Sequence, residues 1–143
     1  MLSKILSKQE CAKCKFCCSF RRQSLWETPV FEWREKMDLL PLYKTQNPDE
    51  EVRCLYLEDG KGCTLSPQKK PFDCKIWPLR VIKTAASNEL KIVLEPTCPA
   101  LQKLPLSQIK DFVNSELKET ILEYANSHPE IVKEDSDFFI KLD

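Results

Sequence analysis

The number and spacing of the cysteines constrain this chain more than any other feature. Its 143 residues include eight cysteines, more than packing alone would use. Four of them form the run Cys11-x-x-Cys14-x-x-Cys17-Cys18, and the others stand singly at Cys54, Cys63, Cys74 and Cys98. Thiolates three residues apart in a loop or a helical turn converge on one side of the backbone, as they do in metal sites. The run therefore predicts that several thiolates share one centre.

The sequence also predicts the redox environment of these thiols. The first eight residues contain no apolar run of the length that a secretion signal needs, and no stretch approaches the roughly 20 apolar residues of a membrane span. We therefore expect a cytoplasmic protein without membrane contact, in which thiols stay reduced. In that compartment the cysteines indicate metal ligands or redox-active thiols. Disulfides stay an alternative for an exported or hyperthermophilic protein.

Composition excludes several common function classes. The only glycines are Gly60 and Gly62, so no glycine-rich loop for a phosphate or a dinucleotide is present. The only histidine, His128, directly precedes a proline, and we interpret it as a helix-terminal residue instead of a ligand. The 22 basic and 22 acidic residues cancel, whereas a nucleic-acid-binding protein usually carries a basic excess. No Ser–His–Asp set or paired-carboxylate motif is visible, so whether the chain is an enzyme is left open.

The chain length fits one domain, residues 1–143. Within it we distinguish a metal-binding cysteine-cluster region, residues 8–100, from a C-terminal helical region, residues 105–143. The expected fold is a small α+β or irregular domain that metal stabilises. It combines cysteine-rich loops and a short hairpin with a C-terminal amphipathic helix.

Turn-forming residues predict the elements of the cysteine-cluster region. Thr28 followed by Pro29 is typical of a helix start, and this helix is expected to end near residue 40. The acidic stretch 44–52 is interpreted as an exposed loop. Residues 55–57 are predicted to form a strand that turns through residues 59–62 into Cys63.

The second half of the chain shows clearer periodicity. Residues 80–84 and 90–95 are predicted to pair as a hairpin across residues 86–89. Ser107 is predicted to cap a helix that ends at His128-Pro129, and a short helix or extended tail is expected over residues 131–142. Apolar residues at a spacing of three to four form a stripe along this helix: Ile109, Phe112, Val113, Leu117, Ile121, Leu122 and Ala125. We expect the stripe to pack on the cysteine-bearing part of the domain, with a dimer or partner surface as the alternative.

The cysteine spacing favours a particular kind of metal centre. Three thiolates at a spacing of three fit three corners of a [4Fe–4S] cube, and in ferredoxins a cysteine followed by proline contributes a ligand. This chain has such a dipeptide at Cys98-Pro99. Tetrahedral zinc also accepts thiolates with this spacing, so zinc is the alternative metal.

The adjacent cysteines predict two centres. Neighbouring Cα atoms are about 3.8 Å apart, and their side chains usually diverge, so Cys17 and Cys18 are expected to serve different metal atoms. We assign one centre to the set Cys11, Cys14, Cys17 and Cys98. The second centre is assigned to Cys18, Cys54, Cys63 and Cys74.

Four motifs carry a resemblance to a known family. They are the Cys11–Cys18 run, Gly62-Cys63, Lys70-Pro71-x-x-Cys74-Lys75-x-Trp77-Pro78 and Cys98-Pro99. Together they resemble the CxxCxxCC cysteine-cluster family, whose YkgJ-type members have eight characteristic cysteines. The resemblance covers residues 8–100 and implies a zinc- or iron-chelating domain.

Charged residues near the cysteines suggest secondary roles. Residues 1–98 contain 17 basic and 13 acidic side chains, and basic neighbours offset the negative charge of a thiolate-bound metal. The candidates are Lys13, Lys15, Arg21, Arg22, Arg53, Lys75 and Arg80. For each of them taken singly, an ordinary surface position is the preferred interpretation. Asp73, beside Cys74, is interpreted as a surface acid, although it is also a candidate hydrogen-bond acceptor behind a metal ligand.

Three functions fit these features. The first is an iron–sulfur protein acting in electron transfer, redox sensing or cluster-dependent modification. The second is an adaptor in which zinc only builds the fold, and the third is a protein that cycles its thiols between redox states. We expect a monomer or a homodimer with an unidentified protein partner and no nucleic acid.

Overall fold

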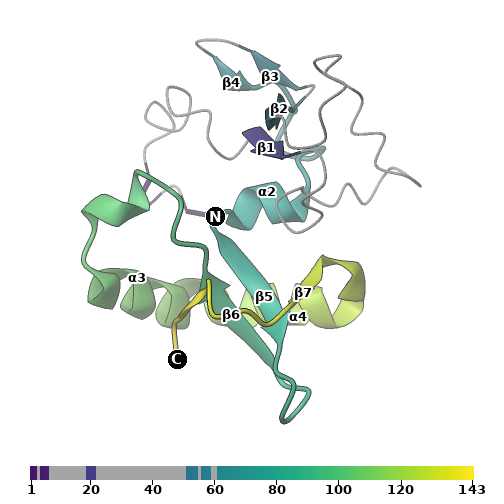
Figure 1. Ribbon diagram of the computed structural model, residues 1–143. Coiled ribbons are helices and arrows are strands. Elements are labelled where there is room, and N and C mark those ends of the chain that lie inside the picture. The colour runs from purple at the N-terminus through teal and green to yellow at the C-terminus, as the bar shows by residue number, and fades with distance from the viewer. Residues whose placement is uncertain (3, 7–18, 22–50, 55, 59–60) are drawn as a thin grey trace. The chain divides into compact units, whose positions relative to one another are not determined.

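The computed structural model describes residues 1–2, 4–6, 19–21, 51–54, 56–58 and 61–143. The chain divides into two compact units, Leu2–Lys75 and Ile76–Asp143 together with Met1. The described elements confirm a small α+β fold (Figure 1). The helix predicted from Thr28 to residue 40 lies outside the described residues.

A four-stranded sheet is the centre of the Ile76–Asp143 unit, with the strand order β7-β5-β6-β8. Its central hairpin joins β5 (Leu79–Lys83) to β6 (Leu90–Leu94) in antiparallel register. The predicted hairpin over residues 80–84 and 90–95 is therefore confirmed to within one residue. In its turn, Asn88 has a φ of 56°, a conformation that asparagine tolerates better than most residues.

One continuous helix follows, made of α3 (Leu106–Phe112), a π-helical segment η3 (Val113–Leu117) and α4 (Lys118–Ser127). The helix ends as predicted, because the N–H of His128 donates to the Tyr124 carbonyl at 2.9 Å and Pro129 follows. Its predicted start at Ser107 is wrong. Pro105 is the N-cap residue, with an extended backbone, and Ser107 lies inside the first turn.

The π-helical segment explains how the apolar stripe stays on one face. The most buried members of the stripe are spaced four residues apart and are 0–6 % exposed: Ile109, Val113, Leu117, Ile121 and Ala125. Four residues of an α-helix turn through about 400°, so such a stripe drifts by about 40° at each step. The wider i→i+5 turn of η3 rotates less per residue and opposes this drift.

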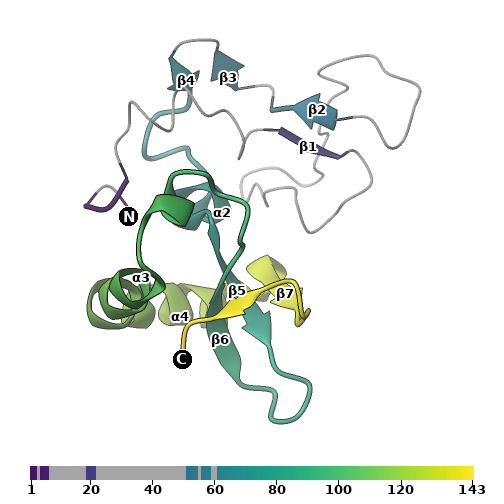
Figure 2. The same ribbon diagram turned by 60° about the vertical axis from the view of Figure 1, so that its left-hand side comes forward.

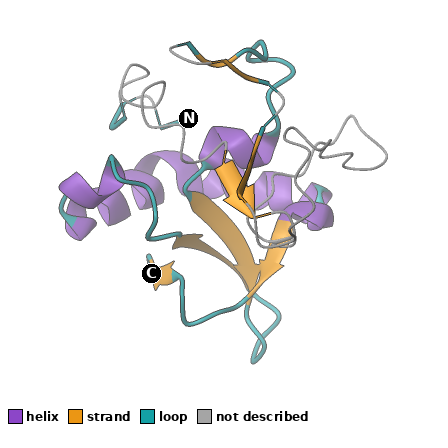
Figure 3. Cartoon of the chain, turned by 45° about the horizontal axis from the view of Figure 1, so that its top comes forward, coloured by secondary structure: helices purple, strands orange, loops and turns teal. Residues whose placement is uncertain are grey.

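The helix covers one face of the sheet, so its stripe packs on β5 and β6, which lie within residues 8–100 but carry no cysteine. It crosses behind the strands of the β5–β6 hairpin (Figure 3), and α4 contacts both strands. Since side chains alternate along a strand, four nearly buried residues share the face beneath it: Leu79, Val81, Ile92 and Leu94.

The C-terminal tail completes the sheet. After a 3-10 turn, η4 (Pro129–Ile131), strand β7 (Val132–Glu134) pairs in parallel with β5, and β8 (Ile140–Lys141) pairs antiparallel with β6. These strands lie at opposite edges, so residues 135–139 cross the face away from α4 (Figures 1 and 2). There Phe139 packs with Ile82 and Val93.

The described residues of the Leu2–Lys75 unit form two small two-stranded sheets. Strand β1 (Ser19–Arg21) pairs with β2 (Glu51–Arg53), and β3 (Leu57–Glu58) pairs with β4 (Gly62–Cys63). The predicted loop over residues 44–52 is therefore wrong at its end, where Glu51 and Val52 lie in β2. A short helix, α2 (Phe72–Ile76), ends at the boundary of the units.

Candidate metal-binding cysteines

The structure describes four of the eight predicted ligands. Cys54, Cys63 and Cys74 belong to the Leu2–Lys75 unit, and Cys98 belongs to the Ile76–Asp143 unit. No disulfide joins any two of these four. The other predicted ligands lie outside the described residues: Cys11, Cys14, Cys17 and Cys18.

The β3–β4 hairpin brings Cys54 and Cys63 to its open end. Cys63 lies opposite Leu57 in the ladder, and the Leu57 N–H donates to the Cys54 carbonyl at 3.0 Å. Two further hydrogen bonds connect the chain segments at this end: the backbone N–H and the hydroxyl of Thr64 both donate to the Tyr56 carbonyl, at 2.7 and 2.8 Å. Both cysteines are half-buried. The prediction that they flank a hairpin is confirmed.

Gly62 allows this hairpin to close. Its φ is 83°, in the left-handed region where a Cβ atom is costly. The Lys61 ammonium lies 2.9 Å from the Glu58 carboxylate across the turn. The glycine therefore serves backbone geometry directly before the candidate ligand Cys63.

Cys74 lies in the middle of α2, half-buried. Its N–H and that of Lys75 both donate to the Pro71 carbonyl, at 3.0 and 3.1 Å. The neighbouring Asp73 is only 2 % exposed, so its interpretation as a surface acid is wrong. A buried carboxylate is retained where it is paired or hydrogen-bonded, which places Asp73 among the residues that organise this segment.

Cys98 lies on a loop that is held by two hydrogen bonds from Gln102. The Gln102 side-chain amide donates to the Pro96 carbonyl at 2.7 Å, and its backbone N–H donates to the Cys98 carbonyl at 3.1 Å. Cys98 is 8 % exposed. The thiol therefore has a defined backbone position within its own unit.

The Thr97 hydroxyl beside Cys98 is unusual. Its oxygen is buried and, among the described residues, has no hydrogen-bond partner. Leaving a buried hydroxyl unsatisfied costs about 1–3 kcal/mol. An O–H without an acceptor in the described part of the protein is free to donate to a bound ligand, and the sulfurs of a metal centre accept such bonds.

The described cysteines do not form a metal site by themselves. Cysteine sulfurs at defined positions are suitable ligands for iron–sulfur clusters and zinc. However, no three His, Cys, Asp or Glu side chains within the described ranges gather closely enough to hold one ion. A site built on these thiols therefore requires ligands from the rest of the chain.

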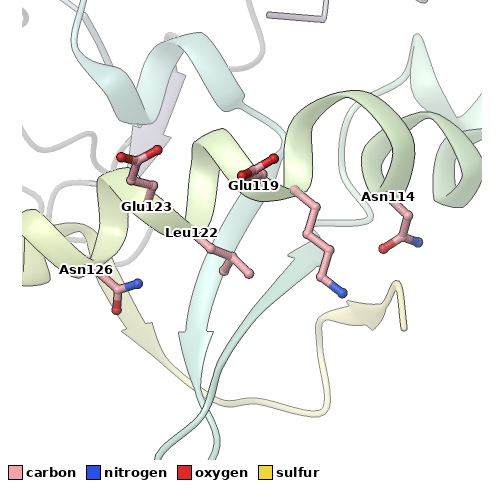
Figure 4. Close-up of a pocket in the computed structure, with 6 residues that line it drawn as sticks. Asn114, Glu119, Leu122, Glu123 and Asn126 are labelled. Atoms are coloured by element: carbon pink, nitrogen blue, oxygen red, sulfur yellow. The ribbon is translucent and has the colours of Figure 1, made fainter.

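A shallow hollow of about 580 Å³ lies against the helix of the other unit, lined by Asn114, Lys118, Glu119, Leu122, Glu123 and Asn126. Figure 4 shows that the labelled side chains spread along the helix instead of pointing toward a common centre. The hollow contains no cysteine and no histidine.

Sequence reasoning missed one arrangement near Cys98. Arg80 and Glu95 form an ion pair with a distance of 3.0 Å between Nε and Oε2, and each side chain is 3 % exposed. The interpretation of Arg80 as an ordinary surface residue is therefore wrong, because its side chain is buried in this ion pair. Its role as a basic neighbour of a metal centre stays a prediction. The available signal was one charged residue near the start of the first hairpin strand and one directly after the second, each next to apolar residues.

No family model, curated protein or solved structure matches this chain. The resemblance described above therefore rests on the cysteine spacing and the surrounding motifs. Among the described residues, no helix has both the length and the apolar character needed to cross a membrane.

Proposed function

We propose that this chain is a thiolate metalloprotein whose eight cysteines bind one or two [4Fe–4S] clusters. Its role would be electron transfer, redox sensing or cluster-dependent modification. The observation that supports this most directly is the β3–β4 register, which brings Cys54 and Cys63 to the same end of a hairpin although nine positions separate them. Paired cysteines on a tight hairpin are a common way to present two ligands.

The proposed ligand sets follow the cysteine spacing. One centre uses Cys11, Cys14, Cys17 and Cys98, and the other uses Cys18, Cys54, Cys63 and Cys74. When bound, a [4Fe–4S] cluster supplies one-electron transfer at a potential that the protein adjusts through hydrogen bonds and burial. The residues of this chain present the thiolates, limit solvent access and, at Thr97, offer a hydroxyl donor.

The experiment is metal and sulfide analysis of the protein purified without oxygen, together with its absorption spectrum. The expected result is iron and acid-labile sulfide in equal amounts, with a brown colour. Stoichiometric zinc in a colourless protein would replace this proposal by the structural zinc module. A protein that holds neither metal after anaerobic purification would overturn the assignment of a metal site.

Serine variants test the ligand sets. Cys14→Ser and Cys63→Ser should each remove a whole centre, because a four-thiolate site with three ligands left is labile. The exposed Ser66, three residues from Cys63, provides the matched control Ser66→Ala, which should keep all its metal. If Cys17→Ser and Cys18→Ser each lose all of the metal, the division into two centres is wrong. Full metal content in Cys63→Ser would remove the hairpin from the site.

A further inference from the structure

A buried charged cluster lies on the sheet face away from α4. The Arg80 Nε donates to the Glu95 carboxylate at 3.0 Å, and the guanidinium carbon lies 4.8 Å from the centre of the Trp77 ring. Both charged side chains are almost fully buried. Arg80 is therefore held by a charged hydrogen bond and by an aromatic face, both of which restrict its orientation.

This cluster fixes the beginning of the Cys98 loop. The Glu95 N–H donates to the Pro78 carbonyl at 2.9 Å, which extends the β5–β6 ladder by one bond. Gln102 fixes the other end through its bonds to Pro96 and Cys98. The segment from Glu95 to Gln102 is therefore fastened at both ends, with Cys98 between them.

Stability alone is a weak reason for a buried pair at this position. Replacing a buried ion pair by apolar residues of similar volume is often neutral or stabilising, because desolvation offsets the attraction between the charges. The neighbouring strand positions, such as Leu79 and Val81, are apolar and nearly fully buried. What the pair adds is a directional contact that apolar side chains do not provide.

We propose that Arg80 and Glu95 are positioning residues that hold the Cys98 loop in the conformation needed to present its thiol to a metal centre. This inference rests on the proposed function, in which Cys98 is a ligand. The pair acts through the backbone of the loop and does not itself bind the metal. Trp77 restricts the guanidinium, and Gln102 provides the second attachment.

The test measures alkylation of individual cysteines in the metal-free full-length protein, by iodoacetamide and peptide mass spectrometry. The double variant Arg80→Met/Glu95→Leu removes both charges of this pair together and is expected to fold. Because a buried thiol reacts through local opening, Cys98 should react about tenfold faster in this variant. Cys63, in the other unit, should react at its wild-type rate and serves as the internal reference.

Two further variants make the result decisive. Gln102→Ala, which releases the other end of the loop, should also accelerate Cys98, and it tests the inference if the double variant does not fold. Lys91→Met removes an ion pair elsewhere in the same sheet and should leave Cys98 unchanged. An unchanged Cys98 rate in a folded double variant would overturn the inference.

Metal loading separates this inference from the proposed function. If wild-type protein binds metal, the double variant should lose the same part of the absorption spectrum as Cys98→Ser. If it keeps the full spectrum, the pair does not position a ligand. If wild-type protein binds no metal while the Cys98 rate still rises in the variant, the proposed function fails and the loop contact stands without its metal role.

Discussion

The Asn114 side-chain amide donates a hydrogen bond to the Leu142 carbonyl at 3.2 Å, and it also donates to the Lys110 carbonyl at 2.9 Å. Asn114 lies in the π-helical segment, and Leu142 directly follows β8. One side chain thus connects the middle of the long helix to the last strand of the sheet. Since β8 has only two residues, this contact adds to what its pairing with β6 provides.

Removing this connection should loosen β8 without unfolding the unit. In Asn114→Ala, the amides of Ile140 and Lys141 should exchange with solvent several times faster, because short edge elements open locally. Hydrogen exchange followed by NMR measures this directly. Asn126→Ala, on the same helix and beside the same hollow, is the matched control. Equal protection of β8 in both variants would contradict the assigned role of Asn114.

The buried stripe of the helix should carry much of the stability of its unit. Ile121 is 0 % exposed, and truncating a fully buried isoleucine to alanine costs about 2–5 kcal/mol. We expect Ile121→Ala to lower the free energy of unfolding by that amount in urea denaturation. Glu119→Ala, at an exposed position two residues earlier, should stay within about 0.5 kcal/mol of wild type. Similar losses in both variants would show that the stripe is not the packing face.

The C-terminal ion pair should respond to acid. The Lys91 ammonium donates to the Asp143 carboxylate and lowers the pKa of Asp143, while the same contact raises the pKa of Lys91. Because the carboxyl pKa is lower in the folded state, its contribution to stability is present above the unfolded pKa. It is lost as the pH falls through the folded pKa.

An NMR titration of the Asp143 carboxyl carbon checks this contact. In Lys91→Met the pKa of Asp143 should rise toward its ordinary value, since the hydrogen bond is the largest cause of its shift. The exposed Lys103, changed to methionine, is the control and should leave that pKa in place. A wild-type Asp143 that titrates with an ordinary pKa would refute the pairing in solution.

Replacing Thr97 by valine should change the stability of the metal-free and the metal-bound protein differently. Thr97→Val removes a buried donor that has no partner among the described residues, so it should stabilise the metal-free chain by about 1 kcal/mol. If the hydroxyl donates to a metal-bound sulfur, that gain should vanish in the metal-bound protein. Urea denaturation of both forms measures the difference.

Thr64→Val is the comparison for this prediction. The Thr64 hydroxyl already donates to the Tyr56 carbonyl, so its removal should destabilise the chain by about 1 kcal/mol. A loss of stability in metal-free Thr97→Val comparable to that of Thr64→Val would show that the Thr97 hydroxyl has a partner in solution.

Part of the candidate site could be predicted from the sequence. The turn before Cys63 was predictable because Asp59-Gly60-Lys61-Gly62 is a local turn signal, and Gly62 adopts the positive φ that such a turn requires. The Arg80–Glu95 pair was not predictable in the same way. Its members lie fifteen positions apart, and their contact depends on the hairpin register and on the burial of one sheet face.

The sequence by itself determined the β5–β6 hairpin, the helix end at His128 and the apolar stripe, because turn chemistry and periodicity act over a few neighbouring residues. Tertiary structure decided the two edge strands of the tail. With three and two residues, β7 and β8 are too short to show a period, and they become strands only by pairing with β5 and β6. Tertiary structure also decided the π-helical turn. The apolar stripe has a spacing of four, which drifts around a regular α-helix, and the π-helical turn keeps the stripe against the sheet.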